Sequence, residues 1–148
     1  MSQTDESRLD IQVGALQQGR RPYHFTPPSQ DDRIRRVFGL SEDTPLPSVD
    51  DQTLATYYDY LIANLVLPFD ALFCPTGGEE RQLIHYVRVT VLMDPRQDRM
   101  LNNLHGLFCK ATNCKNVLDL SLADLGVRED NPNCQLLDDY AYWFVNWR

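Results

Sequence analysis

The chain has 148 residues with a formal net charge of −7, and 43% of its residues are hydrophobic and 24% charged, which is typical of one globular domain with a sizeable core. An acidic chain without a clustered Lys and Arg face is a poor candidate for binding nucleic acid. The longest apolar stretch, 61–69, is broken by Asn64 and Pro68 and is too short to span a membrane, and the first ten residues do not form a secretory signal, so we expect a cytoplasmic protein.

The negative charge is concentrated in one part of the chain. Residues 1–48 carry a net charge of −1, whereas residues 49–148 carry −6, and 16 of the 21 acidic residues are Asp. Asp suits turns, helix caps and the ligation of hard cations better than it suits helix interiors. The region 49–148 is therefore where an acidic function is expected.

The N-terminal part of the chain differs from the rest. Residues 1–30 are polar and proline-containing without helical or strand periodicity, which predicts a disordered or loosely docked arm. Residues 31–40 predict a short helix with its apolar side chains on one side, ended by Gly39 and followed by an extended connector. We expect this segment to dock on the core, and we predict a single domain over 31–148 whose core is 49–148.

Two further helices are predicted from apolar residues at three- and four-residue intervals. The first covers 49–65, with Ser48 as its N-cap and acidic residues in its first turn; its apolar residues are Leu54, Tyr57, Tyr58, Leu61, Ile62 and Leu65. The second begins near residue 134, and its apolar residues are Leu136, Leu137, Tyr140, Trp143, Phe144 and Trp147. If both helices pack on a sheet, Tyr57, Leu61, Tyr140 and Trp143 should be buried.

Between these helices, short segments rich in β-branched and aromatic residues predict strands. The predicted strands are 69–73, 83–93, 106–112 and 117–122, and residues 124–127 close the sheet region. The order of helices and strands predicts an α+β fold. We expect a small antiparallel sheet or partly open barrel of about four to five strands, flanked by an N-terminal and a C-terminal helix.

Patterns for catalysis or structural zinc are missing from the sequence. The four cysteines, Cys74, Cys109, Cys114 and Cys134, form no C-x-x-C pair, so inert thiols without zinc are expected. The three histidines lie near no nucleophile motif, and Gly77-Gly78 lacks the Lys and Ser or Thr of a phosphate-binding loop. We therefore expect no enzymatic activity.

Carboxylates near the predicted turns and at the start of the last helix are the remaining candidates for a site. Calcium takes about six to eight oxygen ligands, which acidic loops with backbone carbonyls can supply. No EF-hand loop pattern occurs, and the alternative is a solvated acidic surface that maintains solubility. These acids are Asp94, Asp98, Asp119, Asp124, Glu129, Asp130, Asp138 and Asp139.

Residues 57–70, YYDYLIANLVLPFD, resemble the signature of the CcbP-type family of small bacterial calcium-binding proteins, in which a Tyr-rich helix runs into a Pro-Phe-acid junction. A central strand at 87–92, a Ser-Leu-Ala-Asp-Leu segment at 121–125 and a closing Asp-Asp-Tyr-x-Tyr-Trp segment at 138–143 follow in the same order. The resemblance covers most of 49–148, and it depends on the order of these segments.

The resemblance implies a compact domain without EF-hands that binds calcium through surface carboxylates and acts in calcium buffering or sensing. The acidic positions inside the matched segments are Asp70, Asp124, Asp138 and Asp139. The first 48 residues and the four cysteines have no counterpart in the pattern, and the surface is not Glu-rich, which lowers the expected calcium affinity. We predict that three or more carboxylates share one cation, drawn from Asp70, Asp94, Asp98, Asp124, Glu129, Asp130, Asp138 and Asp139.

A protein–protein interaction module is the alternative function. In that case the aromatic side chains of the last helix would form an exposed surface for a protein partner. These residues are Tyr140, Tyr142, Trp143, Phe144 and Trp147. Clustered carboxylates would favour calcium binding, whereas a contiguous exposed aromatic patch would favour the interaction module.

Overall fold

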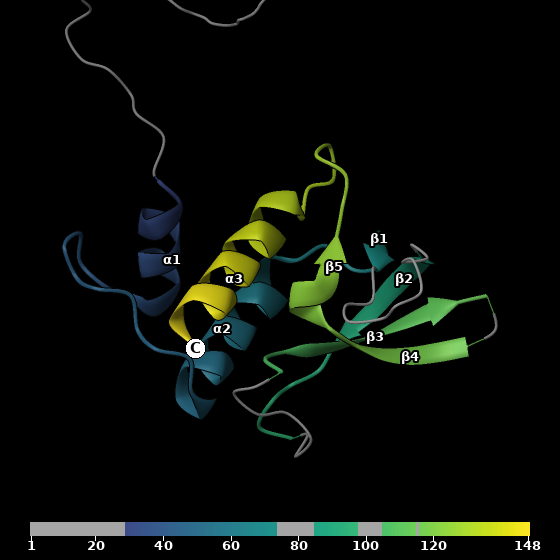
Figure 1. Cartoon of the computed structure of the whole chain (residues 1–148), viewed down its shortest axis with the longest axis horizontal. Coiled ribbons are helices and arrows are strands. Elements are labelled where there is room, and N and C mark those ends of the chain that lie inside the picture. Colours follow the sequence, from purple (N-terminus) through teal and green to yellow (C-terminus); the bar gives the residue numbers. More distant parts are fainter. Residues whose placement is uncertain (1–28, 74–84, 98–104, 115) are drawn as a thin grey trace, which may run out of the picture.

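The computed structural model describes residues 29–73, 85–97, 105–114 and 116–148, and it places three helices together beside one sheet (Figure 1). The helices are α1 (Gln30–Phe38), α2 (Asp51–Asn64) and α3 (Cys134–Trp147), with a short 3-10 turn η2 (Leu122–Asp124). The strands are β1 (Phe69–Phe73), β2 (His85–Leu92), β3 (Phe108–Asn113), β4 (Asn116–Ser121) and β5 (Leu125–Gly126). The predicted α+β fold is confirmed. Nearly all of the predicted arm 1–30 lies outside the described residues.

The sheet has five strands in the order β4-β3-β2-β1-β5, and all neighbouring strands are antiparallel. Along β1 and β2, buried and exposed residues alternate, with Ala71, Val87 and Val89 on the buried face. This alternation is expected of an antiparallel sheet with one face on the core. A bulge between Val89 and Val91 shifts the pairing with β3, which leaves one unpaired residue and bends the strand.

An aromatic cluster forms the centre of the core between the helices and the sheet. The four residues expected to be buried are buried, with exposed fractions of 1% for Tyr57 and 0% for Leu61, Tyr140 and Trp143. The ring of Tyr57 lies 5.0 Å from the ring of Trp143 and 5.2 Å from that of Tyr140. Aromatic pairs at such distances stabilise a core beyond the area that they bury. The helical periodicity in the sequence therefore identified the core faces of α2 and α3, except that Ile62 is 43% exposed.

Helix α2 begins two residues later than the Ser48 cap predicts. Asp50 is the N-cap: its carboxylate accepts a hydrogen bond from Thr53 N at 2.8 Å, and Asp50 N donates to Thr53 Oγ1 at 2.8 Å. This reciprocal capping box satisfies two backbone donors. Val49 lies outside the helix, and its backbone N–H donates to Trp147 O at the end of α3.

Strand β3 also begins two residues after the predicted start at Gly106. Gly106 has a φ of +70°, and a Cβ at this position would collide with the Tyr140 hydroxyl and lie 2.8 Å from the Phe144 ring. The next residue, Leu107, donates its backbone N–H to Tyr140 Oη at 2.8 Å. The carbonyl of Leu107 accepts a hydrogen bond from Leu122 N at 2.8 Å, so residues 106–107 are fixed by α3 and by the start of η2.

Helix α1 docks on the core as the sequence predicts. Ser29 caps its first turn, Gly39 ends it in the left-handed conformation, and Ile34 is fully buried. The ring of Phe38 lies 5.3 Å from that of Trp143 and 5.6 Å from that of Tyr57. The apolar side of α1 therefore joins the same aromatic cluster as α2 and α3.

Candidate metal site

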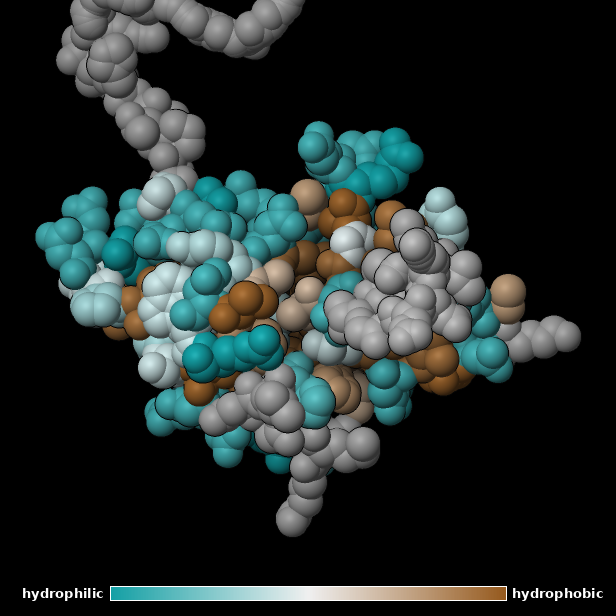
Figure 2. Space-filling model, in the orientation of Figure 1, coloured by the Kyte–Doolittle hydropathy of each residue, from teal (hydrophilic) through white to brown (hydrophobic). Residues whose placement is uncertain are grey.

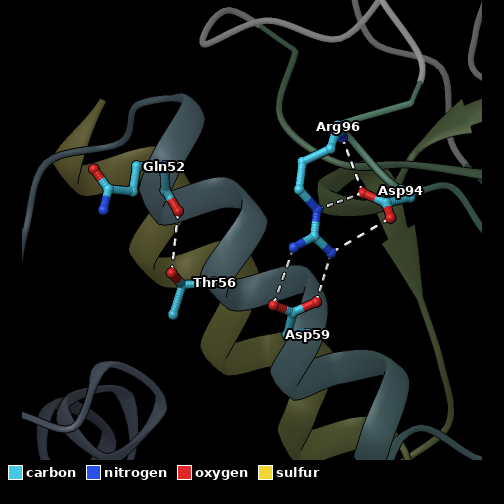
Figure 3. Close-up of polar contacts among 5 residues, drawn as sticks. All are labelled: Gln52, Thr56, Asp59, Asp94 and Arg96. Carbon is cyan, nitrogen blue, oxygen red and sulfur yellow. Dashed lines mark hydrogen bonds and ion pairs between the residues drawn. The ribbon is translucent and has the colours of Figure 1, made fainter.

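Two acidic side chains from different elements meet at one arginine, as Figure 3 shows. Asp59 lies on α2 and Asp94 follows β2. The guanidinium of Arg96 lies between them: Nη2 is 2.6 Å from Asp59 Oδ1, and Nε is 2.9 Å from Asp94 Oδ1. Further contacts of 3.3 Å make the arginine bidentate to both carboxylates. We call these three residues the Arg96 cluster.

Within the Arg96 cluster, Asp94 and Arg96 change each other's pKa. The hydrogen bond from Arg96 lowers the pKa of Asp94 below its ordinary value, although partial burial acts in the opposite direction. The same contacts raise the pKa of Arg96. Asp94 is therefore held in the ionised form by a positive charge that belongs to the chain itself.

A second acidic region surrounds an open groove at the start of α3. The groove has a volume of about 410 Å³ and is lined by Gln30, Arg33, Glu129, Asn131, Pro132, Cys134, Gln135 and Asp138. We call it the α3 groove. One wall comes from α1, and another comes from the loop 127–133, which projects from the surface as a hydrophilic knob between β5 and α3 (Figures 1 and 2).

The loop 127–133 is anchored at its end by Asn133. This side chain is 1% exposed. Its Oδ1 accepts a hydrogen bond from Val66 N at 2.9 Å, and its Nδ2 donates to Val66 O at 3.0 Å. Asn131 Oδ1 in turn accepts from Asn133 N at 2.8 Å. A buried amide with its donor and its acceptor both satisfied holds a segment firmly, so the base of the α3 groove is fixed to the junction between α2 and β1.

The carboxylates of the α3 groove differ from those of the Arg96 cluster in their partners. Glu129 and Asp138 are exposed, and no lysine or arginine in the described part of the chain forms an ion pair with either of them. Cys134 Sγ lies 3.7 Å from Asp138 Oδ2. Burial, followed by the charges of Asp138 and Glu129, raises the pKa of the Cys134 thiol. The negative charges of Glu129 and Asp138 thus both affect the Cys134 thiol, which lines the groove.

Asp139, which the sequence suggests as a calcium ligand, has a different role. Its side chain is buried, and its two carboxylate oxygens contact α1: Arg33 Nε donates to Oδ2 at 2.8 Å, Arg33 Nη2 to Oδ1 at 2.9 Å, and Gln30 Nε2 to Oδ1 at 2.9 Å. A bidentate arginine and an amide use the accepting directions that a metal would need. We therefore omit Asp139 from the candidate metal site.

The other candidate ligands are dispersed. Asp70 pairs with Arg88 and Asp130 with Arg128, each at 3.3 Å on the surface. Asp124 is exposed in η2, and Asp98 lies outside the described residues. Within the described ranges, no group of three or more His, Cys, Asp and Glu side chains is arranged to hold a metal. The predicted three-carboxylate cluster is not found there; of the predicted ligands, Glu129 and Asp138 line one groove.

The cysteines lie in three different environments. Cys109 is buried in β3, Cys134 lies at the start of α3, and Cys114 is in the turn before β4; all three are free thiols. Burial raises the pKa of Cys109 to about 12. Cys74 lies outside the described residues, and the absence of zinc stays a prediction.

The sequence did not identify three of the residues that organise these regions. Asp59, Arg96 and Arg33 act through partners that are 37, 37 and 106 positions away along the chain. For Asp59 a signal was available, because it lies on the polar side of α2 within the segment that resembles the CcbP signature. For the two arginines, the sequence offers no signal beyond their charge.

A family model for calcium-binding proteins of the CcbP type matches residues 48–144. The match covers well over half of the chain and spans α2, the whole sheet and nearly all of α3, so the chain belongs to the CcbP calcium-binding family. No curated protein and no solved structure gives a significant match. In the described part of the chain, each helix is too short or too polar to cross a membrane.

The donor chemistry of the α3 groove fits calcium. Calcium prefers oxygen ligands, tolerates irregular geometry and completes its shell with carbonyl oxygens and water. The groove offers the carboxylates of Glu129 and Asp138 and the side-chain amide of Gln135, whereas Asn131 Oδ1 already accepts from Asn133 N. In the Arg96 cluster, by contrast, a guanidinium already contacts both carboxylates.

Proposed function

We propose that the protein is a calcium buffer or sensor of the cytoplasm, without catalytic activity, and that the α3 groove is its calcium site. Membership of a calcium-binding family supports the ligand. The observation that carries the choice of site is that Glu129 and Asp138 line one groove without an arginine or lysine paired to either of them within the described residues.

The proposed ligands predict a weak affinity for calcium. Glu129 and Asp138 would supply the charge, and amide oxygens of the groove and water molecules would complete the shell. Two carboxylates are fewer than an EF-hand loop provides, and the groove lies at the positive end of the α3 dipole, which disfavours a cation. Weak binding in an open groove suits a buffer that exchanges calcium rapidly.

Calorimetric titration of the full-length protein tests this proposal. Calcium should bind to the wild type with a measurable heat, and magnesium should bind more weakly because it demands octahedral geometry and gives up water reluctantly. The double variant Glu129→Gln, Asp138→Asn should lose the calcium heat. Its matched control is Glu42→Gln, Asp43→Asn, which removes the same charge from exposed positions between α1 and α2.

The two variants separate a site from a general charge effect. If both double variants weaken calcium binding equally, calcium responds only to net charge and the groove is not the site. If neither variant changes the titration, calcium binds elsewhere on the chain.

The alternative function, an interaction module built on the aromatic residues of α3, loses most of its support. Tyr140, Trp143 and Phe144 are buried in the core, and only Tyr142 and Trp147 are partly exposed. Their ring centroids lie 5.5 Å apart, so the two rings contact each other beside α3. The contiguous aromatic surface that this function needs is therefore not formed.

A further inference from the structure

Helix α1 lies outside the part of the chain that matches the calcium-binding family, because the match begins at residue 48 and α1 ends at Phe38. It is nevertheless attached to the family domain by specific contacts. Ile34 is fully buried, and Arg33 forms a bidentate ion pair with the buried carboxylate of Asp139. Side chains this well matched hold α1 in one position on α3.

The docked helix also forms part of the proposed calcium site. Arg33 and Gln30 line the α3 groove together with Glu129 and Asp138, whereas Asp139 does not line it. Arg33 therefore borders the groove, and its guanidinium is paired with the buried carboxylate of Asp139. Asp138 and Asp139 are neighbours on α3. Asp138 lines the groove, whereas Asp139 binds Arg33 of α1.

In this arrangement, docked α1 should repel a cation that binds in the groove. A cation in the groove is nearer to Arg33 than to Asp139 and is repelled by the guanidinium. Gln30 can contribute at most one neutral amide dipole in the opposite direction, and its nitrogen is already bonded to Asp139. A full charge outweighs one dipole, so docking of α1 disfavours a cation in the groove.

We propose that α1 is a regulatory helix of this chain, whose docking through Arg33 and Asp139 opposes calcium binding in the α3 groove. The inference rests on the proposed function of the groove. Thermodynamic linkage makes the effect reciprocal: calcium should loosen α1 by the same factor by which docked α1 weakens calcium binding. The family domain would then bind calcium more tightly whenever another partner or condition releases α1.

Hydrogen exchange of the full-length protein measures the docking of α1 directly. Amides of residues 30–38 should exchange about five-fold faster at saturating calcium than without calcium, at matched ionic strength. The Glu129→Gln, Asp138→Asn variant should show no such acceleration. Faster exchange in the wild type alone supports the coupling, whereas unchanged or slower exchange of these amides overturns it.

Three single variants test the same coupling from the calcium side. Arg33→Gln removes the ion pair, and Ile34→Ala weakens docking without a change of charge; both should tighten calcium binding about five-fold. Arg36→Gln is the matched control, because Arg36 is exposed on α1 and its loss removes one positive charge without contacting Asp139. Equal effects of Arg33→Gln and Arg36→Gln, or an unchanged affinity in Ile34→Ala, would contradict the inference.

These results separate the coupling from the proposed function. A calcium titration that depends on Glu129 and Asp138, together with α1 exchange that calcium does not change, overturns the coupling alone. A titration without any calcium heat overturns the proposed function, and the regulatory role of α1 with it.

Discussion

The Arg96 cluster and the α3 groove are both pairs of carboxylates brought together by the fold, and they differ in what lies between the carboxylates. Asp59 and Asp94 share the guanidinium of Arg96 at 2.6 and 2.9 Å. Glu129 and Asp138 line a groove of about 410 Å³ without a paired arginine or lysine among the described residues. Acidic composition therefore does not by itself define a cation site, because an arginine of the chain can occupy the place of the cation.

Asp138 and Asp139 extend this comparison to neighbours in the sequence. Asp139→Ala should lower the free energy of unfolding by about 3 kcal/mol, because it removes the buried carboxylate that accepts hydrogen bonds from Arg33 and Gln30. Asp138→Ala should change it by less than about 0.5 kcal/mol, because Asp138 is exposed. Urea denaturation of both variants measures the difference. Similar losses in both would show that burial of Asp139 does not distinguish the two carboxylates.

Removing the positive charge of Arg96 should leave Asp59 and Asp94 free to bind a cation, as proposed for the α3 groove. In Arg96→Gln, Asp59 and Asp94 lose the guanidinium that joins them, and their mutual repulsion should be relieved by a divalent cation. We expect a second calcium-binding event with a dissociation constant of about 1 mM, as in weak extracellular calcium modules. Calorimetric titration checks the stoichiometry, and Arg128→Gln, which breaks the exposed pair with Asp130, is the control. An unchanged stoichiometry in Arg96→Gln would mean that the pair is not organised for a cation.

The smallest expected effect is the acid response of the Arg96 cluster. The pKa of Asp94 is lowered in the folded protein from its ordinary value of 3.8. The ion pair therefore stabilises the fold fully above pH 3.8 and less as the pH falls through the lower folded value. Urea denaturation between pH 5 and 2 should show a shallower loss of stability in Asp94→Asn than in the wild type. Parallel curves would show that Asp94 makes no such contribution.

The sequence predicts the fold well where the signal is local. Periodicity places α2 and α3, because burial of one face repeats at a fixed interval along each helix, and the run of apolar and aromatic residues places β1. The boundaries that differ are set by contacts between distant segments. The start of α2 is moved from Ser48 to Asp50 by the capping box and by the bond from Val49 to Trp147.

The candidate site was less predictable for the same physical reason. Glu129 and Asp138 were named as ligands from their acidic loops and helix start, and the structure places both at one groove. Asp139 has the same local sequence signal as Asp138, but it is paired with an arginine that lies 106 positions away. Only the packing of α1 on α3 distinguishes the two, and no pattern within a short window contains that information.

The double hydrogen bond between Asn133 and Val66 has a consequence for the entropy of binding. Loop 127–133 begins at β5, which pairs with β1, and it ends at Asn133, whose side chain is bonded to the backbone of the α2–β1 junction. Both ends of the loop are thus fixed in the folded protein before any cation arrives. The conformational freedom of the loop is lost during folding, so a cation that binds there needs to order only a few side chains.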